Sequence, residues 1–239
     1  MLIESYALKN ILTTVLITGT ITLVIVLLLM LVRKKINIGD ELFRKLMHFT
    51  AILITPLCLY FAIDFYIAML CLFIFAIGGA IGLRLIEKVK SYSSFFVERE
   101  KHEIRKSFVS YCNIQACLIL VCGVYGDIGI IYIELMVWAL GDTVAALCGK
   151  KWGKRHFKCA FTDRNKTYVG SVSMLIVVFI ISFIALLIMY DYSALRVICQ
   201  SGIIAVVATM AELLSKKGRD TITIPVIVSL VCLIFDMLF

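Results

Sequence analysis

The segment WALGDTVAALCGKKWGKRHFK, residues 138–158, combines residue types that could bind a metal ion and phosphate groups. Asp142 follows Gly141 within an apolar run, and the cations that come after it are Lys150, Lys151, Lys154, Arg155 and Lys158. A carboxylate is a ligand that Mg²⁺ prefers, and lysine and arginine bind phosphate oxygens. Gly141 leaves space for a close approach beside the carboxylate. The segment therefore predicts a site for a polyanion, unless Asp142 pairs with an internal cation and only fixes helix packing.

A second basic group lies in GDELFRKLMH, residues 39–48, which we expect to form a short helix that enters a membrane. Asp40 and Glu41 suit the start of such a helix, because the helix dipole is positive there. Arg44 and His48 are four residues apart and share a face, with Lys45 adjacent. Arginine, lysine and histidine on one helical edge favour phosphate recognition.

Two later segments carry residues suited to the same chemistry. In NKTYVGS, residues 165–171, Lys166 comes shortly before Gly170 and Ser171, where a membrane helix is expected to begin. The first N–H groups of a helix bind anions, so this helix start predicts a phosphate cradle. In AELLSKKGRDTITIP, residues 211–225, Glu212 and Asp220 flank a basic turn. Carboxylates beside cations are what a Mg²⁺-nucleotide site requires.

Membrane helices must position these residues, as the composition shows. The 239 residues are 62% hydrophobic and 17% charged, whereas a soluble domain is roughly half apolar. A membrane span needs about 20 predominantly apolar residues. We predict an all-α fold, a polytopic integral membrane helical bundle with eight transmembrane helices. The expected spans are 11–32, 49–64, 65–83, 107–124, 127–148, 169–190, 194–215 and 221–238. Seven spans remain an alternative, because the second, third and last segments are short or interrupted by polar residues.

The sequence has no Pro/Gly/Ser-rich linker, so we expect a single membrane domain over residues 1–239. Its expected parts are an N-terminal anchor helix at 1–35, a catalytic core at 36–225 and a last span at 221–239. The nine cysteines include no C-x-x-C pair, which favours small apolar side chains over disulfides or zinc ligands.

The distribution of basic residues predicts the orientation. Of the 24 Lys and Arg residues, 22 lie in four segments that fall on one side of an eight-span topology: 33–47, 84–106, 149–166 and 216–219. The positive-inside rule makes this side cytoplasmic and places both termini outside. Segment 84–106 mixes glutamates with its cations, so we expect a solvated helical hairpin that contacts anionic lipid head groups. Segment 149–166 has one acid, Asp163, among seven cations, a composition suited to holding a polyanion.

Taken in order, the motifs resemble those of the polyprenol kinase family, which includes dolichol kinase, phytol kinase and the CTP-dependent diacylglycerol kinase of yeasts. They are R-K-x-x-H at 44–48, G-D-x-x-A-x-x-x-G-x-x-x-G-K at 141–154, N-K-T-x-x-G-S at 165–171, and an acidic turn before T-x-P at 223–225. The resemblance spans roughly residues 40 to 225.

The resemblance implies a multi-pass membrane kinase with its active site facing the cytoplasm. Such an enzyme transfers the γ-phosphoryl group of CTP, or of ATP as an alternative, to a lipid hydroxyl with Mg²⁺ as cofactor. The implied residues are Asp142, Lys45, His48 and Lys166 for catalysis; Arg44, Arg105, Gly141, Gly149, Lys150, Gly153, Lys154, Arg155, Asn165, Thr167, Gly170 and Ser171 for the nucleotide; and Asp142, Glu212 and Asp220 for the metal. Members often read D-N-x-T-x-P in the last motif, and Thr221 replaces that asparagine here, which leaves the nucleotide preference open.

The expected partners of such a kinase are a lipid alcohol, a nucleoside triphosphate and the membrane, and no nucleic acid. Two other functions are alternatives. A cytidylyltransferase would join CTP to a lipid phosphate, but the H-G-G element associated with that class is absent. A transporter would carry internal repeats and polar residues along a path across the membrane, whereas here these residues gather toward one side. The sequence has no P-loop, so a nucleotide site must be built from helix ends. Neither the acceptor lipid, prenol or diacylglycerol, nor the oligomeric state follows from the sequence.

Overall fold

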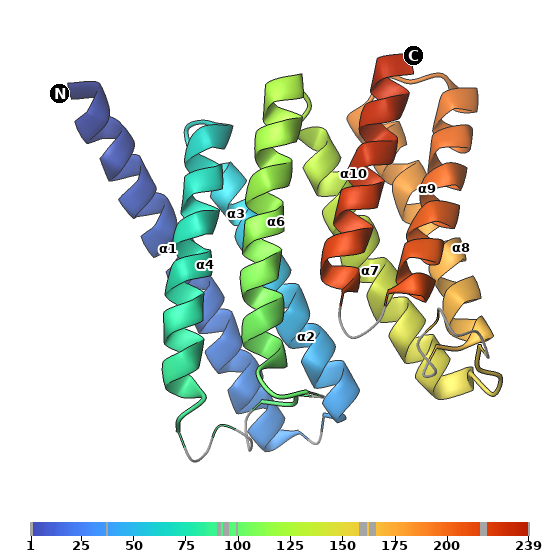
Figure 1. Cartoon of the computed structure of the whole chain (residues 1–239), viewed down its shortest axis with the longest axis horizontal. Helices are drawn as coiled ribbons and strands as arrows, with labels where there is room; N and C mark the ends of the chain where they lie inside the picture. Colours follow the sequence, from blue (N-terminus) through green and yellow to red (C-terminus); the bar gives the residue numbers. More distant parts are fainter. Residues whose placement is uncertain are drawn as a thin grey trace. The chain divides into compact units, whose positions relative to one another are not determined.

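The structure is a computed structural model in which the chain is described over residues 2–238 with a few gaps (Figure 1). The gaps are residues 37, 90–91, 93–95, 99, 158–161, 163–165 and 216–218, and the side chains of residues 2–4 are also outside the description. The regular structure of the described residues is helical apart from one isolated β-bridge. The all-α prediction is confirmed.

Eight helices among the described residues are long and apolar enough to cross a membrane, which agrees with the predicted count. The helices are α1 (Leu2–Lys35), α2 (Asp40–Ile52), α3 (Ile54–Phe61), α4 (Phe65–Ile86), α6 (Glu103–Tyr125), α7 (Gly129–Trp152), α8 (Tyr168–Met189), α9 (Ala194–Leu214) and α10 (Asp220–Leu238). The second span comprises α2 and α3 together, Asp40–Phe61. The short helix expected at 40–48 and the span expected from residue 49 thus belong to one candidate span that begins at Asp40.

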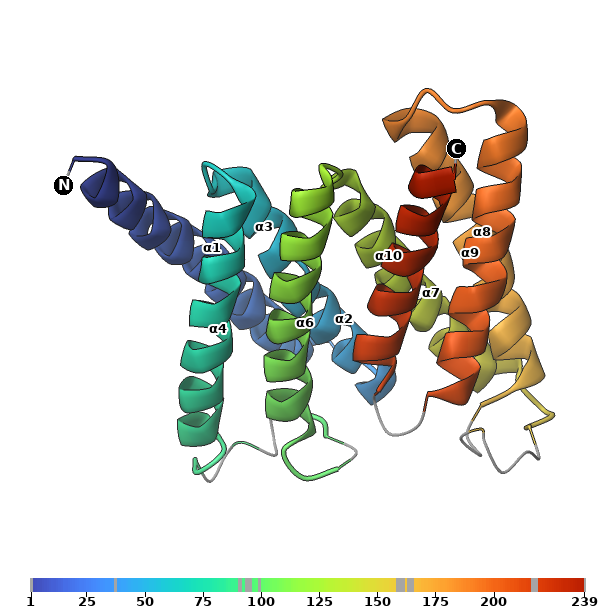
Figure 2. The same ribbon diagram turned by 45° about the horizontal axis from the view of Figure 1, so that its top comes forward.

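The chain divides into two compact units, Met1–Val124 (unit 1) and Tyr125–Phe239 (unit 2), and each is described by itself. The single domain expected from the sequence stays a prediction. In unit 1, α1 packs against α2, α3 and α4. Helices α4 and α6 lie side by side in Figures 1 and 2. Aromatic rings of one helix pack on glycines of the other, since a Cβ on Gly79 would lie 2.2 Å from the Phe108 ring and one on Gly123 2.4 Å from the Phe65 ring.

The break between α2 and α3 has a local cause in Pro56. Proline has no N–H, so the carbonyl of Ile52, four residues earlier, loses its helical hydrogen bond. The hydroxyl of Tyr111 on α6 donates to this carbonyl over 2.8 Å and lies 2.5 Å from the Thr55 hydroxyl. Tyr111 is 2% exposed. A side chain from another helix thus satisfies the backbone group that proline leaves open, which a membrane interior requires.

Replacing Tyr111 by phenylalanine should destabilise the protein by about 1–3 kcal/mol, because a buried carbonyl loses its donor. Thermal unfolding of the purified protein in detergent should show an apparent melting temperature lower by several degrees. Tyr60→Phe is the matched control in the same unit, since Tyr60 is 77% exposed. Equal melting temperatures for the two variants would contradict this role for the Tyr111 hydroxyl.

In unit 2, α7 packs against α8, α9 and α10, and α9 packs against α8 and α10 (Figures 1 and 2). Small residues occur at every fourth position along α7 and at its C-cap: Gly141, Ala145, Gly149 and Gly153. A Cβ on Gly141 would lie 2.7 Å from the Val178 side chain, and one on Gly149 would lie 2.9 Å from the Thr167 hydroxyl. This stripe lets α8 approach the backbone of α7 closely, as small residues do between membrane helices.

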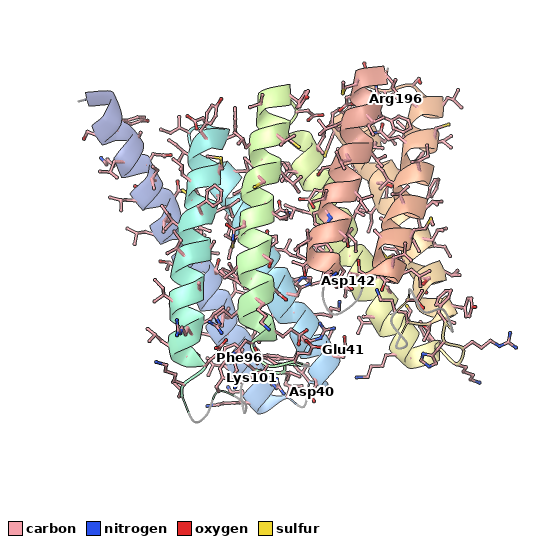
Figure 3. The ribbon with its side chains drawn as sticks, viewed as in Figure 1. Asp40, Glu41, Phe96, Lys101, Asp142 and Arg196 are labelled. Atoms are coloured by element: carbon pink, nitrogen blue, oxygen red, sulfur yellow. The ribbon has the colours of Figure 1, made fainter. Side chains whose placement is uncertain are left out.

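A polar network closes the end of unit 2 where Arg196 lies, opposite the end toward which Asp142 lies (Figure 3). The Arg196 guanidinium lies 2.5 Å from Asp236, which also accepts from the Tyr192 hydroxyl at 2.7 Å. The Tyr190 hydroxyl donates to Asp127, and its ring stacks on that of Tyr192. Burial, together with these carboxylates, raises the pKa of both tyrosines. The network ties together the start of α7, the turn between α8 and α9, and the end of α10.

Candidate functional site

A buried ion pair joins two of the predicted site residues in unit 2. Lys166 comes two residues before α8, and Glu212 lies in the last turn of α9. The Lys166 ammonium lies 2.7 Å from a Glu212 carboxylate oxygen and also donates to the Glu212 main-chain carbonyl. The two side chains are 16% and 11% exposed. The ammonium group is therefore held at a fixed position on the end of α9.

Two further carboxylates lie near this pair. Asp142 on α7 and Asp220 at the start of α10 are both close enough to Glu212 to interact with it electrostatically. Asp142 is 6% exposed, and an Asp220 oxygen accepts from the Thr221 N–H at 3.1 Å. Asp142 and Glu212 lie inside membrane-spanning helices, and Lys166 and Asp220 lie at helix starts. Residues from four segments that are distant in the sequence thus meet toward one end of unit 2.

The carboxylates fit Mg²⁺ by their chemistry but do not form a complete protein cage. Among the described residues, no group of three or more His, Cys, Asp and Glu side chains has an arrangement that could hold a metal ion. The three predicted metal ligands, Asp142, Glu212 and Asp220, therefore do not form such a group, and the Glu212 carboxylate pairs with Lys166. Mg²⁺ commonly needs only one or two carboxylates, with substrate phosphates and water completing its octahedron. Asp142 and Asp220 could supply those carboxylates.

A short bridge between the ends of the α7–α8 connection holds Lys166 in place. His156 and Thr167 form an antiparallel β-bridge, and the Phe157 N–H donates to the Lys166 carbonyl at 3.1 Å. The Phe157 ring packs on that of Tyr168, with centroids 4.0 Å apart. The sequence reasoning did not identify His156 and Phe157 as positioning residues. The one signal was their place directly after Lys154 and Arg155, beyond the glycine that ends the apolar run.

The start of α8 differs from the predicted phosphate cradle. The Gly170 N–H donates to the Thr167 hydroxyl at 3.1 Å, and the Ser171 N–H donates to the Thr167 carbonyl at 3.1 Å. Thr167 is thus the N-cap of α8, and a Cβ on Gly170 would lie 2.8 Å from the Ala145 carbonyl. The Gly170 and Ser171 amides are thus bonded within the helix cap, whereas the prediction had both open to an anion.

The glycines of the motif at 141–154 have a packing role in the structure. The close approach expected beside Gly141 is made by Val178 and Met174 of α8. Gly149 and Gly153 both face Thr167. These glycines therefore bring the start of α8 against the end of α7, and so they act on the site through the placement of Lys166.

The predicted cations near the end of α7 lie on the protein surface. Lys150, Lys154 and Arg155 are exposed, and the Arg155 carbonyl accepts from the Tyr168 N–H at 3.2 Å. That bond places Arg155 next to the segment that carries Lys166. Asn165, also predicted to contact the nucleotide, lies outside the described residues.

The remaining predicted site residues belong to unit 1. Arg44 and His48 are half-buried on α2, and Lys45 is 2% exposed. The Arg44 guanidinium lies 2.5 Å from Glu41, one turn earlier. Arg105, at the start of α6, lies 3.1 Å from Glu87.

Comparison with known proteins gives one informative match. A stretch of 93 residues is 29% identical to a phytol kinase of Synechocystis sp. (strain ATCC 27184 / PCC 6803 / Kazusa). Over part of its length, the chain is similar to a phytol kinase. The stretch covers 39% of this chain and 39% of the length of that kinase. No family model and no solved structure matches the chain. The match agrees with the family resemblance of the motifs and does not cover the remainder of the chain.

Proposed function

We propose that the protein is a membrane lipid kinase. It transfers the γ-phosphoryl group of a nucleoside triphosphate, CTP in the first instance, to the hydroxyl of a prenol-type lipid or of diacylglycerol. The observation that carries the proposal is the meeting of Asp142, Lys166, Glu212 and Asp220 at the helix ends of unit 2. The partial similarity to a phytol kinase supports the same reaction class.

The proposed roles follow from the chemistry of each side chain. In the reaction, the lipid oxygen bonds to the γ-phosphorus, the bond to the β-phosphate oxygen breaks, and the hydroxyl proton is released. Phosphoryl transfer is accelerated mainly by positioning and by neutralising charge on the phosphate oxygens. Mg²⁺ held by Asp142 and Asp220 would supply part of that charge. Lys166 supplies a second cation, and Glu212 positions the Lys166 ammonium group.

The location of the cluster suits two substrates of opposite solubility. Asp142 lies within α7, whereas Lys154 and Arg155 follow the end of that helix and are exposed to water. A lipid hydroxyl lies at the boundary between hydrocarbon and water, and a nucleotide approaches from the water side. We place this boundary on the cytoplasmic side, because basic segments between membrane spans face the cytoplasm.

Transfer of a radiolabelled γ-phosphate tests the reaction. Membranes that contain the protein should phosphorylate at least one of phytol, geranylgeraniol, polyprenol and diacylglycerol, with CTP used in preference to ATP. CDP should appear as the second product, since a cytidylyltransferase would release pyrophosphate. Inside-out vesicles should use added nucleotide, and sealed right-side-out vesicles should not. Absence of labelled lipid with every acceptor, or release of pyrophosphate, would contradict the kinase proposal.

A further inference from the structure

A basic cavity lies in unit 1, where α4 ends and α6 begins. Its volume is about 390 Å³, and its lining consists of Arg84, Glu87, Lys88, Lys101, His102 and Arg105. Four of these residues are lysine or arginine and one is acidic, so positive charge exceeds negative charge in the lining. Lys101 is labelled near the start of α6 in Figure 3. The sequence predicted a solvated hairpin with general contact to anionic lipid head groups for this segment, and no defined binding site.

The single carboxylate of the cavity orients two of the basic side chains. Glu87 is 8% exposed, and its two oxygens lie 2.7 Å from the His102 Nδ1 and 3.1 Å from the Arg105 Nε. Both partners are held on the same carboxylate, one oxygen each. Arg84, Lys88 and Lys101 add three further positive charges around the cavity. The lining thus combines side chains that are held in place by ion pairs with an excess of positive charge.

Hydrogen bonds also hold the backbone at His102 and Ile104 in place. Glu98 accepts from the N–H groups of His102 and Ile104 at 3.2 and 3.1 Å and from the Tyr92 hydroxyl at 2.8 Å. Burial and this hydrogen bond raise the pKa of Tyr92. His102 adopts a φ of 64°, in the left-handed region that side chains other than glycine rarely occupy. Such a conformation persists only when the surrounding contacts impose it, and these contacts present His102 to Glu87 and the cavity.

We propose that this cavity binds a phosphate group, and specifically the head group of an anionic phospholipid. Arginine and lysine are the side chains that bind phosphate oxygens, and a guanidinium can do so with two parallel hydrogen bonds. The cavity lies between the ends of two membrane-spanning helices, Phe65–Ile86 and Glu103–Tyr125, which is the depth of lipid head groups. The proposal concerns lipid binding, and its test does not depend on the proposed kinase reaction.

Binding of short-chain lipids to the full-length protein in neutral detergent tests the proposal. Mass spectrometry of the intact complexes should show tighter binding of dioctanoyl phosphatidylglycerol than of dioctanoyl phosphatidylcholine. The double variant Arg84→Gln/Lys101→Gln should bind phosphatidylglycerol about 25-fold more weakly, since each interfacial cation contributes about fivefold. The charge-retaining variant Arg84→Lys/Lys101→Arg should stay within about twofold of the wild type.

The matched control is Lys35→Gln/Lys106→Gln, which removes two exposed cations of unit 1 that do not line the cavity. Its affinity for phosphatidylglycerol should also stay within about twofold of the wild type. An equal loss of affinity in this control would overturn the proposal. Equal binding of phosphatidylglycerol and phosphatidylcholine by the wild type would overturn it as well. Inorganic phosphate is a second probe. If inorganic phosphate by itself displaces the lipid, and if this displacement depends on Arg84 and Lys101, the cavity recognises a free phosphate compound. If the double variant cannot be purified, each single variant should show about a fivefold loss.

Discussion

Asp142→Asn should lower the rate of γ-phosphoryl transfer at least 100-fold while the protein still folds and inserts. The substitution keeps the volume of the side chain and removes its negative charge. An interaction that stabilises the charge of the transition state is worth about 100-fold or more in rate. Asp142 is 6% exposed within α7, so water has little access to take over the role of the lost carboxylate. The measurement is turnover of labelled CTP at saturating lipid, repeated over a range of Mg²⁺ concentrations.

Asp191→Asn serves as the matched control, because Asp191 is exposed in the connection between α8 and α9 of the same unit. The control should retain full turnover. If Asp142→Asn keeps more than about a tenth of the wild-type rate, Asp142 is not the principal metal ligand. A melting temperature equal to that of the wild type would show that the loss comes from the site and not from unfolding.

Lys166→Ala should reduce kcat/KM for the nucleotide about 100-fold, with little change in the KM for the lipid. The Lys166 ammonium is held 2.7 Å from Glu212 and is the most buried of the cations predicted to contact phosphate in unit 2. Lys151→Ala removes an exposed cation from the same basic region, where Lys151 lies 4.8 Å from the Trp152 ring. This control should be close to silent. Equal and mild effects at the two positions would mean that the basic segment sets only membrane orientation.

Loss of Lys166 also leaves the Glu212 carboxylate without its closest cation, which can destabilise a protein by about 3–5 kcal/mol. The double variant Lys166→Met/Glu212→Gln removes both charges and should regain most of the stability. Its kinase activity should remain low, because no ammonium group is present to contact phosphate. Recovery of activity together with stability would show that the ion pair is only structural. The two readouts, melting temperature and nucleotide kcat/KM, therefore separate the two roles.

The sequence alone determined that the chain is a bundle of membrane helices and which residue types the candidate site holds, with eight spans favoured over seven. The spans follow from composition, because a stretch of about 20 predominantly apolar residues has the length and the polarity of a membrane-spanning helix. Asp142, Lys166, Glu212 and Asp220 were identified because charged residues within or beside membrane spans are costly and need a compensating role. The helix of the second span begins at Asp40 and not at residue 49, because its first part carries charges on one face and apolar residues on the other and does not read as a continuous apolar run.

Only the tertiary structure decided how these residues are used. The pairing of Lys166 with Glu212 joins positions that are 46 residues apart in the sequence, and it depends on the rotation of α9 relative to the start of α8. The same holds for the Tyr111 hydroxyl on the Ile52 carbonyl and for the Glu87 carboxylate between His102 and Arg105. The glycines of the 141–154 motif suggested a ligand, and the structure shows α8 in the space they leave. A local pattern reports which side chains a helix carries, whereas the packing of helices fixes which of them meet.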